Sequence, residues 1–283
     1  MVAATKVLST KFAGFVGGDD FWRGVVAIAA FLIFWEAGSR SHAWFGFSFP
    51  WVSQVPAPTA VFQAMVKLVQ EPSFWNSALL STLRVFEGFF AAMVIGIPLG
   101  LAMAVSRVFF GIAFPVFEVL RPIPPLAWVP ASIIFWPTQE LSIAFVTFLG
   151  AFFTIVINVI GGARAIDVRY FQAARSMGSS TWDIFRRIIL PGTLPSIVVG
   201  ATVGVGITWA VVVAAEMISG GGSAGSVGGA AGGGLGFFIW NSYVGGSYTQ
   251  IVAGMISIGI AGYVSSALLR KIGNWMTPWL SEN

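Results

Sequence analysis

Cysteine is missing from the 283-residue sequence, and His42 is the single histidine. Without thiols the chain can form neither a disulfide framework nor a zinc–thiolate site. A metal site would have to be assembled from scattered carboxylates, so we expect this chain to bind no metal and no other cofactor. The same shortage leaves a membrane-bound enzyme without nucleophile, base or metal clusters, and we predict no catalytic residues.

Charged residues are also scarce, because they make up 9% of the chain against roughly 25% in soluble domains. Hydrophobic residues supply 57%. In lipid every backbone polar group must be satisfied internally, which a helix achieves within one segment. The composition therefore excludes a soluble protein and predicts an all-α integral membrane protein.

Apolar runs of about 20 residues, the length that crosses a bilayer as a helix, predict six spans. They run approximately over Trp22–Gly38, Leu83–Val105, Ile112–Trp136, Leu141–Gly162, Leu194–Ser219 and Gln250–Leu269. The third contains RPIPPLAWVP, residues 121–130, whose four prolines must kink or unwind it. Backbone freed in this way persists at membrane depth only beside protein or a water-filled cavity, so this stretch indicates a pathway.

Lysine and arginine gather in alternate loops, and such a bias sets the orientation of a membrane protein. They precede the first span, follow the second and sixth, and cluster between the fourth and fifth. The bias predicts that both termini and the segment between the fourth and fifth spans are cytoplasmic. Residues 1–21 have no apolar core followed by a cleavage site, so we expect a cytoplasmic N-terminal segment and a membrane domain over residues 22–283.

Two loops on the opposite side are distinctive. The first is rich in aromatic residues and proline and predicts a short surface helix at about Ala60–Gln70. The second, at about residues 219–236, is a glycine–serine tract that we expect to be a flexible external loop.

The basic segment from Tyr170 to Ser196 interrupts the apolar spans. Ser180 and Asp183 have the spacing of a capping box, which predicts a short helix that Pro191 ends. Gly178 separates it from a preceding helix, and Trp182, Phe185 and Ile189 fall on one face. One reading is an interfacial helix held by arginines on anionic lipid.

A second reading rests on the letters QAARSMGSSTWDIFRRIILP, residues 172–191. This stretch resembles the EAA motif of permease subunits in ATP-binding cassette (ABC) importers, which reads E-A-A, three residues, G, nine residues, I, one residue, L-P. The matching positions are Gln172, Ala173, Ala174, Gly178, Ile188, Leu190 and Pro191. Glutamine at 172 is the one departure, since the family usually has glutamate. The resemblance implies coupling helices at about residues 168–190 that dock on an ATPase subunit.

Further stretches resemble the permeases of nitrate, sulfonate, taurine and bicarbonate importers. They are STLRVFEGFFAAMVIGIPLGLAMAVSR (81–107), RPIPPLAWVPASIIFW (121–136), VVVAAEMI (211–218) and GLGFFIWNSY (234–243). The resemblance implies a type I importer permease with six transmembrane helices in the bacterial inner membrane. It also implies a homodimer with two cytoplasmic ATPase subunits that bind ATP and Mg²⁺, and an extracytoplasmic binding protein that delivers a small anion or zwitterion.

No G-x-x-x-x-G-K-[S/T] phosphate loop occurs in the sequence, so this chain cannot hydrolyse ATP by that route. We expect lipid but no nucleic acid as a further partner. Alternatives are a permease for another small organic solute, or a stand-alone channel or carrier. The latter leaves the EAA-like spacing unexplained.

Charges inside spans are costly and are candidate functional groups. Arg84 with Glu87, and Glu118 with Arg121, have the spacing i to i+3, so each pair can neutralise itself on one helix face. Arg121 is the better candidate for the translocation path, because it adjoins the prolines and a guanidinium fits planar oxyanions. The other candidates for this path are Glu118, Pro124, Trp128, Thr208, Trp209 and Glu216. Glu216 could pair with an arginine of a neighbouring span or act as a gate, and we favour such a structural or gating role because a carboxylate repels a bare anion. For Trp209 simple aromatic packing is the alternative.

Overall fold

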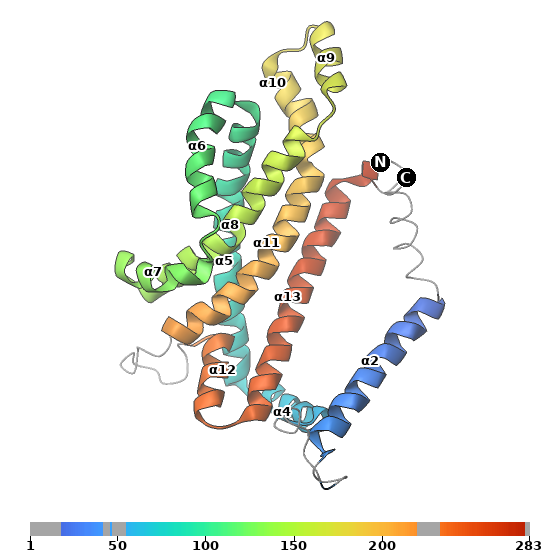
Figure 1. Ribbon diagram of the computed structural model, residues 1–283, viewed down its shortest axis with the longest axis vertical. Helices are drawn as coiled ribbons and strands as arrows, with labels where there is room; N and C mark the ends of the chain where they lie inside the picture. The colour runs from blue at the N-terminus through green and yellow to red at the C-terminus, as the bar shows by residue number, and fades with distance from the viewer. Residues whose placement is uncertain (1–17, 42–45, 47–54, 220–232, 281–283) are drawn as a thin grey trace. The chain divides into compact units, whose positions relative to one another are not determined.

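The computed structural model describes residues 18–41, 46, 55–219 and 233–280 (Figure 1). Within these ranges every regular element is a helix, as the sequence predicts. Residues 1–17, His42 and most of the glycine tract at 219–236 lie outside the described residues, so the expectations for them stay predictions. The chain divides into two units, residues 1–70 with 246–253 and residues 71–245 with 254–283.

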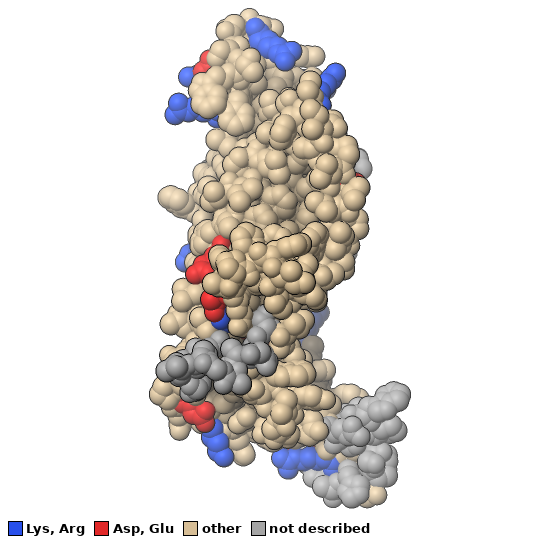
Figure 2. Space-filling view, turned by 90° about the vertical axis from the view of Figure 1, so that its left-hand side faces the viewer, with Lys and Arg blue, Asp and Glu red and all other residues tan. Residues whose placement is uncertain are grey.

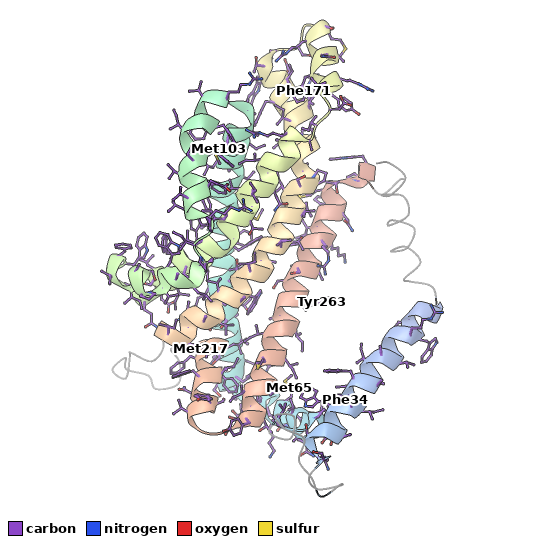
Figure 3. All side chains as sticks on the ribbon, in the orientation of Figure 1. Phe34, Met65, Met103, Phe171, Met217 and Tyr263 are labelled. Atoms are coloured by element: carbon purple, nitrogen blue, oxygen red, sulfur yellow. The ribbon has the colours of Figure 1, made fainter. Side chains whose placement is uncertain are left out.

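The first unit holds helices α2 (Gly18–Ser39) and α4 (Pro58–Val69). Apolar side chains such as Phe34, 71% exposed, project from α2, as expected for a span that faces lipid (Figure 3). Near its end, Glu36 accepts hydrogen bonds from the Thr59 backbone N–H at 3.2 Å and from its hydroxyl at 2.9 Å. These bonds tie α2 to the first turn of α4. The predicted first span and surface helix are both confirmed.

The second unit is organised around α8 (Gln139–Arg164), which packs against both α5 (Pro72–Val105) and α11 (Leu190–Ser219) (Figure 1). Of its most apolar stretch 61% is buried, more than in any other span described. The helices approach closely because small residues line the contacts. A Cβ at Gly88 would lie 2.1 Å from Thr147 Oγ1, and one at Gly200 would lie 2.8 Å from Asn158 Cβ.

The predicted third span is broken at its prolines. It consists of α6 (Arg107–Leu120), the 3₁₀ turn η3 (Pro125–Trp128) and α7 (Val129–Phe135), with a bend of 86° between its two halves. Met103 on α5 and Phe117 on α6 belong to a buried cluster that fixes α6 on α5 and α8 (Figure 3). The described residues hold five helices able to span a membrane, or six if the bent pair counts as one span.

After α8 come α9 (Val168–Ser176), α10 (Thr181–Ile184), the π-helical turn η4 (Phe185–Ile189) and α11. The prediction that Pro191 ends a short helix is wrong. Pro191 lies in the first turn of α11, and α10, η4 and α11 form one apolar helical span over Thr181–Ile218. A proline ring clashes with the carbonyl four residues earlier in an α-helix, and the wider turn of a π-helix, where the Leu190 N–H donates to the Phe185 carbonyl, relieves this clash.

The chain then forms α12 (Leu235–Val244), α13 (Tyr248–Met276) and the 3₁₀ turn η6 (Pro278–Leu280). The sequence did not predict α12, because its ten residues are too short to stand out as a span. Part of α13 contacts α11, since Trp209 Nε1 donates to Ser265 Oγ at 3.2 Å.

Candidate functional sites

The EAA-like segment adopts a sharply defined turn. At the end of α9 the Ser179 N–H donates to the Ala174 carbonyl and the Gly178 N–H to the Arg175 carbonyl, both at 3.0 Å. This is a Schellman motif, and Gly178 occupies its left-handed position with φ of +75°. The space around Gly178 is open, so glycine is required here by backbone conformation and not by packing.

The next helix starts with the predicted capping box. The Asp183 N–H donates to Ser180 Oγ at 3.2 Å, and the Ser180 N–H donates to Asp183 Oδ2 at 3.3 Å. Ile184 and Ile189 turn inward and are 8% exposed each. Trp182 was expected to share one face with Ile189, but it is 67% exposed and stacks on Phe185, whereas Ile189 is buried.

The surface of this segment is both apolar and basic. Met177 is 78% exposed and Tyr170 64%, beside the exposed Arg175 and Arg187. Figure 2 shows basic side chains gathered at the end of the second unit that carries α9 and α10. Among the motif residues Ala174 is buried, whereas Gln172, Ala173, Gly178 and Leu190 are exposed and Ile188 and Pro191 half-buried. Such a surface fits a protein partner.

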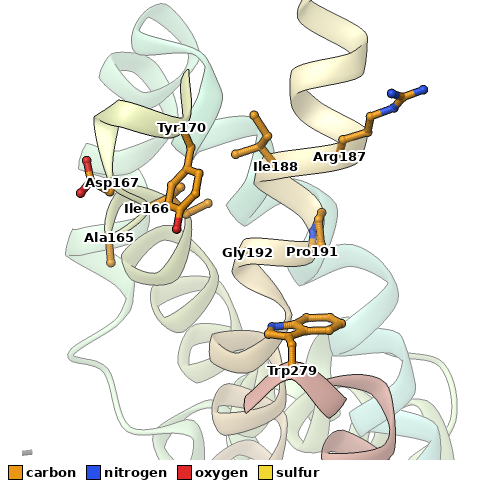
Figure 4. A pocket seen from close by; sticks show the side chains of 9 residues that line it. All are labelled: Ala165, Ile166, Asp167, Tyr170, Arg187, Ile188, Pro191, Gly192 and Trp279. Atoms are coloured by element: carbon orange, nitrogen blue, oxygen red, sulfur yellow. The ribbon is translucent and has the colours of Figure 1, made fainter. Parts of the chain in front are cut away.

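A pocket of about 500 Å³ lies beside this surface (Figure 4). Ile166, Tyr170, Ile188 and Pro191 form its walls, and Trp279 of η6 lies on its opposite side. The guanidinium of Arg187 points away from it. The C-terminal turn is therefore next to the motif residues Ile188 and Pro191.

The opposite end of α11 carries a buried polar network. Glu216 is 1% exposed, and its Oε1 accepts a bond from Arg84 Nη1 of α5 at 3.0 Å. The Ser81 hydroxyl lies 2.8 Å from each carboxylate oxygen, and the Gly236 N–H donates to Oε2 at 2.9 Å. Of the two roles left open for Glu216, the ion pair with an arginine of a neighbouring span is therefore present.

Arg84 does not pair with Glu87, so that prediction is wrong. Its Nε donates to Glu140 Oε2 at 2.8 Å, and Nη2 donates to the other oxygen, which makes the contact bidentate. Glu140 lies in the first turn of α8 and is 60% exposed. Glu87 is exposed, whereas a guanidinium that is only 3% exposed requires partners that reach into the interior.

Two glycines bring α12 against this network. A Cβ at Gly234 would lie 2.1 Å from Glu216 Oε1, and one at Gly236 would lie 2.2 Å from the Val213 carbonyl oxygen. The Leu235 N–H between them donates to Ser81 Oγ at 2.8 Å. Neither Ser81 nor Glu140 was predicted from the sequence as part of this site. The sequence did hold a signal for the ion pair, namely the scarcity of charged residues. Because the spans contain few arginines, a buried Glu216 has few possible partners on other spans.

The predicted pair of Arg121 and Glu118 is present but loose. Arg121 Nη1 lies 3.7 Å from Glu118 Oε1, and the side chains are 45% and 50% exposed. Pro124 is exposed in the break that follows. Nearby, the Trp128 Nε1 atom is buried and has no hydrogen-bond partner among the described residues. Arg121, unlike Arg84, has donors free for another ligand.

Thr208 and Trp209 do not face an open path within one chain. Thr208 is buried and donates to the Gly204 carbonyl at 2.9 Å. Trp209 is 3% exposed and contacts α13. Both side chains therefore contribute to the packing of helices within the chain.

Comparison with known proteins decides the family. Residues 96–282 match the family described as "Binding-protein-dependent transport system inner membrane component". The chain belongs to this family. It is 32% identical to the nitrate import permease protein NrtB of Synechocystis over 93% of this chain and 92% of that protein. It is 30% identical to the bicarbonate transport system permease protein CmpB of Synechococcus elongatus (94% and 91% covered) and to the taurine transport system permease protein TauC of Escherichia coli (81% of each).

Solved structures show the same fold. An inward-facing structure of the MetNI methionine ABC transporter matches with a TM-score of 0.58 and 22% identity over 74% of this chain and 99% of that one. A bacterial alginate ABC transporter matches with a TM-score of 0.51 and 12% identity over 100% and 96%. The fold is that of a type I importer permease. The chain is thus a multi-pass transmembrane permease subunit of an ABC importer.

Proposed function

We propose that this permease forms the path for a small anion or zwitterion, of the nitrate, bicarbonate or taurine class, across the bacterial cytoplasmic membrane. Similarity to permeases named for these three solutes along most of the chain supports the proposal. A homodimer of the chain would span the membrane, and an extracytoplasmic binding protein would deliver the solute.

The energy would come from two cytoplasmic ATPase subunits, which bind ATP and Mg²⁺. The observation that carries this part is the segment from α9 to η4, where a Schellman turn and a capping box hold an exposed apolar and basic surface. The EAA-like residues lie on this surface or directly beneath it. The segment continues without a break into α11, so force applied to it would reach the membrane.

Arg121 is the residue we assign to the path. The rise of about 1.5 Å per residue puts it about 20 Å from Arg107, the first residue of α6, and so well inside an apolar layer of about 30 Å. It adjoins the bend of 86°, where backbone groups leave the helix. A passing anion needs an attractive but weak site, and Glu118 nearby tempers the positive charge.

Vesicle uptake tests the proposal. The chain is reconstituted alone and with its candidate ATPase, the binding protein is supplied outside, and labelled nitrate, bicarbonate and taurine are offered. We expect ATP-dependent uptake of one of them by the complex and none by the chain alone. Uptake by the chain alone without ATP would instead show a stand-alone channel or carrier. A thermal-shift screen of the binding protein against the same solutes identifies the cargo.

A further inference from the structure

Helix α11 joins two sites that the sequence keeps far apart. It begins directly after the segment from α9 to η4 (residues 168–189), which we call the coupling segment, and it carries Glu216 in its last turn. Leu190 and Glu216 are 26 positions apart, which corresponds to about 39 Å of helix, enough to cross the membrane. The ATPase would act at the start of α11, whereas Glu216 lies near its other end. A group bound to Glu216 is therefore attached to the same helix, on the opposite side of the membrane.

Glu216 holds helix α12. Its carboxylate accepts the Gly236 N–H, while Ser81, hydrogen-bonded to the same carboxylate, accepts the Leu235 N–H. These are the first two amides of α12, which have no partner within the helix. The absence of a Cβ at Gly234 and Gly236 allows the contact.

Arg84 also takes part in the attachment of α12, through its contact with the Glu216 carboxylate. It gives Glu216 a buried counter-ion on α5 and reaches Glu140 at the start of α8. One guanidinium thus links three spans at the point where α12 is attached.

We infer that Glu216 and Arg84 are positioning residues that make α12 move as one body with α11, so that the coupling segment and α12 respond together during transport. The inference rests on the proposed function, because it assumes that an ATPase acts on the coupling segment. On the predicted orientation α12 lies on the external side, where a binding protein would sense its position.

The first test uses the complete complex with ATPase and binding protein in vesicles. Glu216→Gln keeps the shape of the side chain and removes the charge, and Gly236→Ala pushes α12 from the Val213 carbonyl with no change of charge. We expect both variants to assemble and to hydrolyse ATP at the basal rate. Stimulation of hydrolysis by the loaded binding protein should fall about fivefold or more, the lower range for coupling between two sites.

Glu87→Gln is the matched control, because Glu87 is an exposed acid on α5 three residues from Arg84. Native stimulation in both Glu216→Gln and Gly236→Ala would overturn the inference. Loss of assembly in both would overturn it as well, since the residues would then serve the fold alone. The proposed function fails by a different result, namely a native complex whose uptake is independent of ATP.

A second test measures position directly. The chain has no cysteine, so Val203→Cys on α11 and Tyr243→Cys on α12, both at exposed positions, can carry spin labels without further changes. Labelled chain is diluted with unlabelled chain in the complex. We expect one narrow distance with and without ATP, which broadens when Glu216→Gln is added. A native distance that changes with ATP would show that α12 moves separately from α11.

Discussion

The guanidinium of Arg84 and the carboxylate of Glu216 lie 3.0 Å apart, and neither side chain is more than 3% exposed. A buried ion pair contributes little by itself, but loss of one partner leaves a buried charge without compensation. The pair also carries the bonds to Ser81 and Gly236. Its removal should therefore affect more than one helix.

Arg84→Met should destabilise the protein by about 3–5 kcal/mol, because Glu216 would remain buried and unpaired. The double variant with Glu216→Gln should recover part of this loss. Thermal melting of the purified chain measures both, with Glu87→Gln as the control that leaves stability unchanged. A single variant as stable as the native chain would show that water or another group compensates Glu216.

Gly178→Ala should weaken coupling through the backbone. A left-handed φ costs an alanine about 1–2 kcal/mol, and no neighbouring atom would otherwise obstruct a Cβ. Gly178→Asn should be tolerated better, because asparagine adopts this conformation more readily. Co-purification of the ATPase and ATP-dependent uptake are the measurements.

Gly161→Ala is the control for this comparison, since Gly161 also has open space but lies within α8 at a helical φ. Equal losses in Gly178→Ala and Gly178→Asn would contradict an explanation by backbone strain. If both Gly178 variants co-purify with the ATPase and transport like the native chain, the segment would serve only as a lipid anchor.

Trp182→Ser should lower affinity for the ATPase by about tenfold or more, since exposed tryptophans are frequent hot spots at interfaces. The side chain is 67% exposed, so the fold should keep its stability. Trp75→Ser is the control, because Trp75 is 55% exposed on α5 near the end far from the coupling segment. Titration of the ATPase onto the chain in detergent gives the two affinities, and equal values would exclude Trp182 from the interface.

The sequence predicted those features that depend on local composition. Apolar runs located the spans, the prolines located the break, and the spacing of Ser180 and Asp183 located a helix start. Each depends on residues that are close along the chain. The partner of Arg84 depends instead on which helices are neighbours, and Glu216 lies 132 positions away. The continuation of the helix through Pro191 was mispredicted for another reason. A proline ordinarily ends a helix, but the π-helical turn η4 lets the helix continue past Pro191.

Arg121→Ala should slow uptake while the complex stays assembled and stable. The pair with Glu118 is loose at 3.7 Å, and both side chains are about half exposed. An ion pair that faces water contributes about 0–1 kcal/mol, so, if Arg121 lines a water-filled path as we propose, its loss should leave the melting temperature nearly unchanged. Arg121→Lys should restore uptake only in part, because lysine keeps the charge but lacks the planar fork that binds oxyanions with two donors.

Arg107→Ala is the matched control, since Arg107 is an exposed arginine at the other end of α6. If Arg121 serves only to neutralise Glu118, the single variant should be destabilised and the double variant Arg121→Ala with Glu118→Gln should regain both stability and transport. If Arg121 contacts the passing anion, the double variant should be stable and still slow, because the attractive charge is gone. Expression level, melting temperature and uptake of the single and double variants separate the two cases, and full transport by a stable double variant would remove Arg121 from the path.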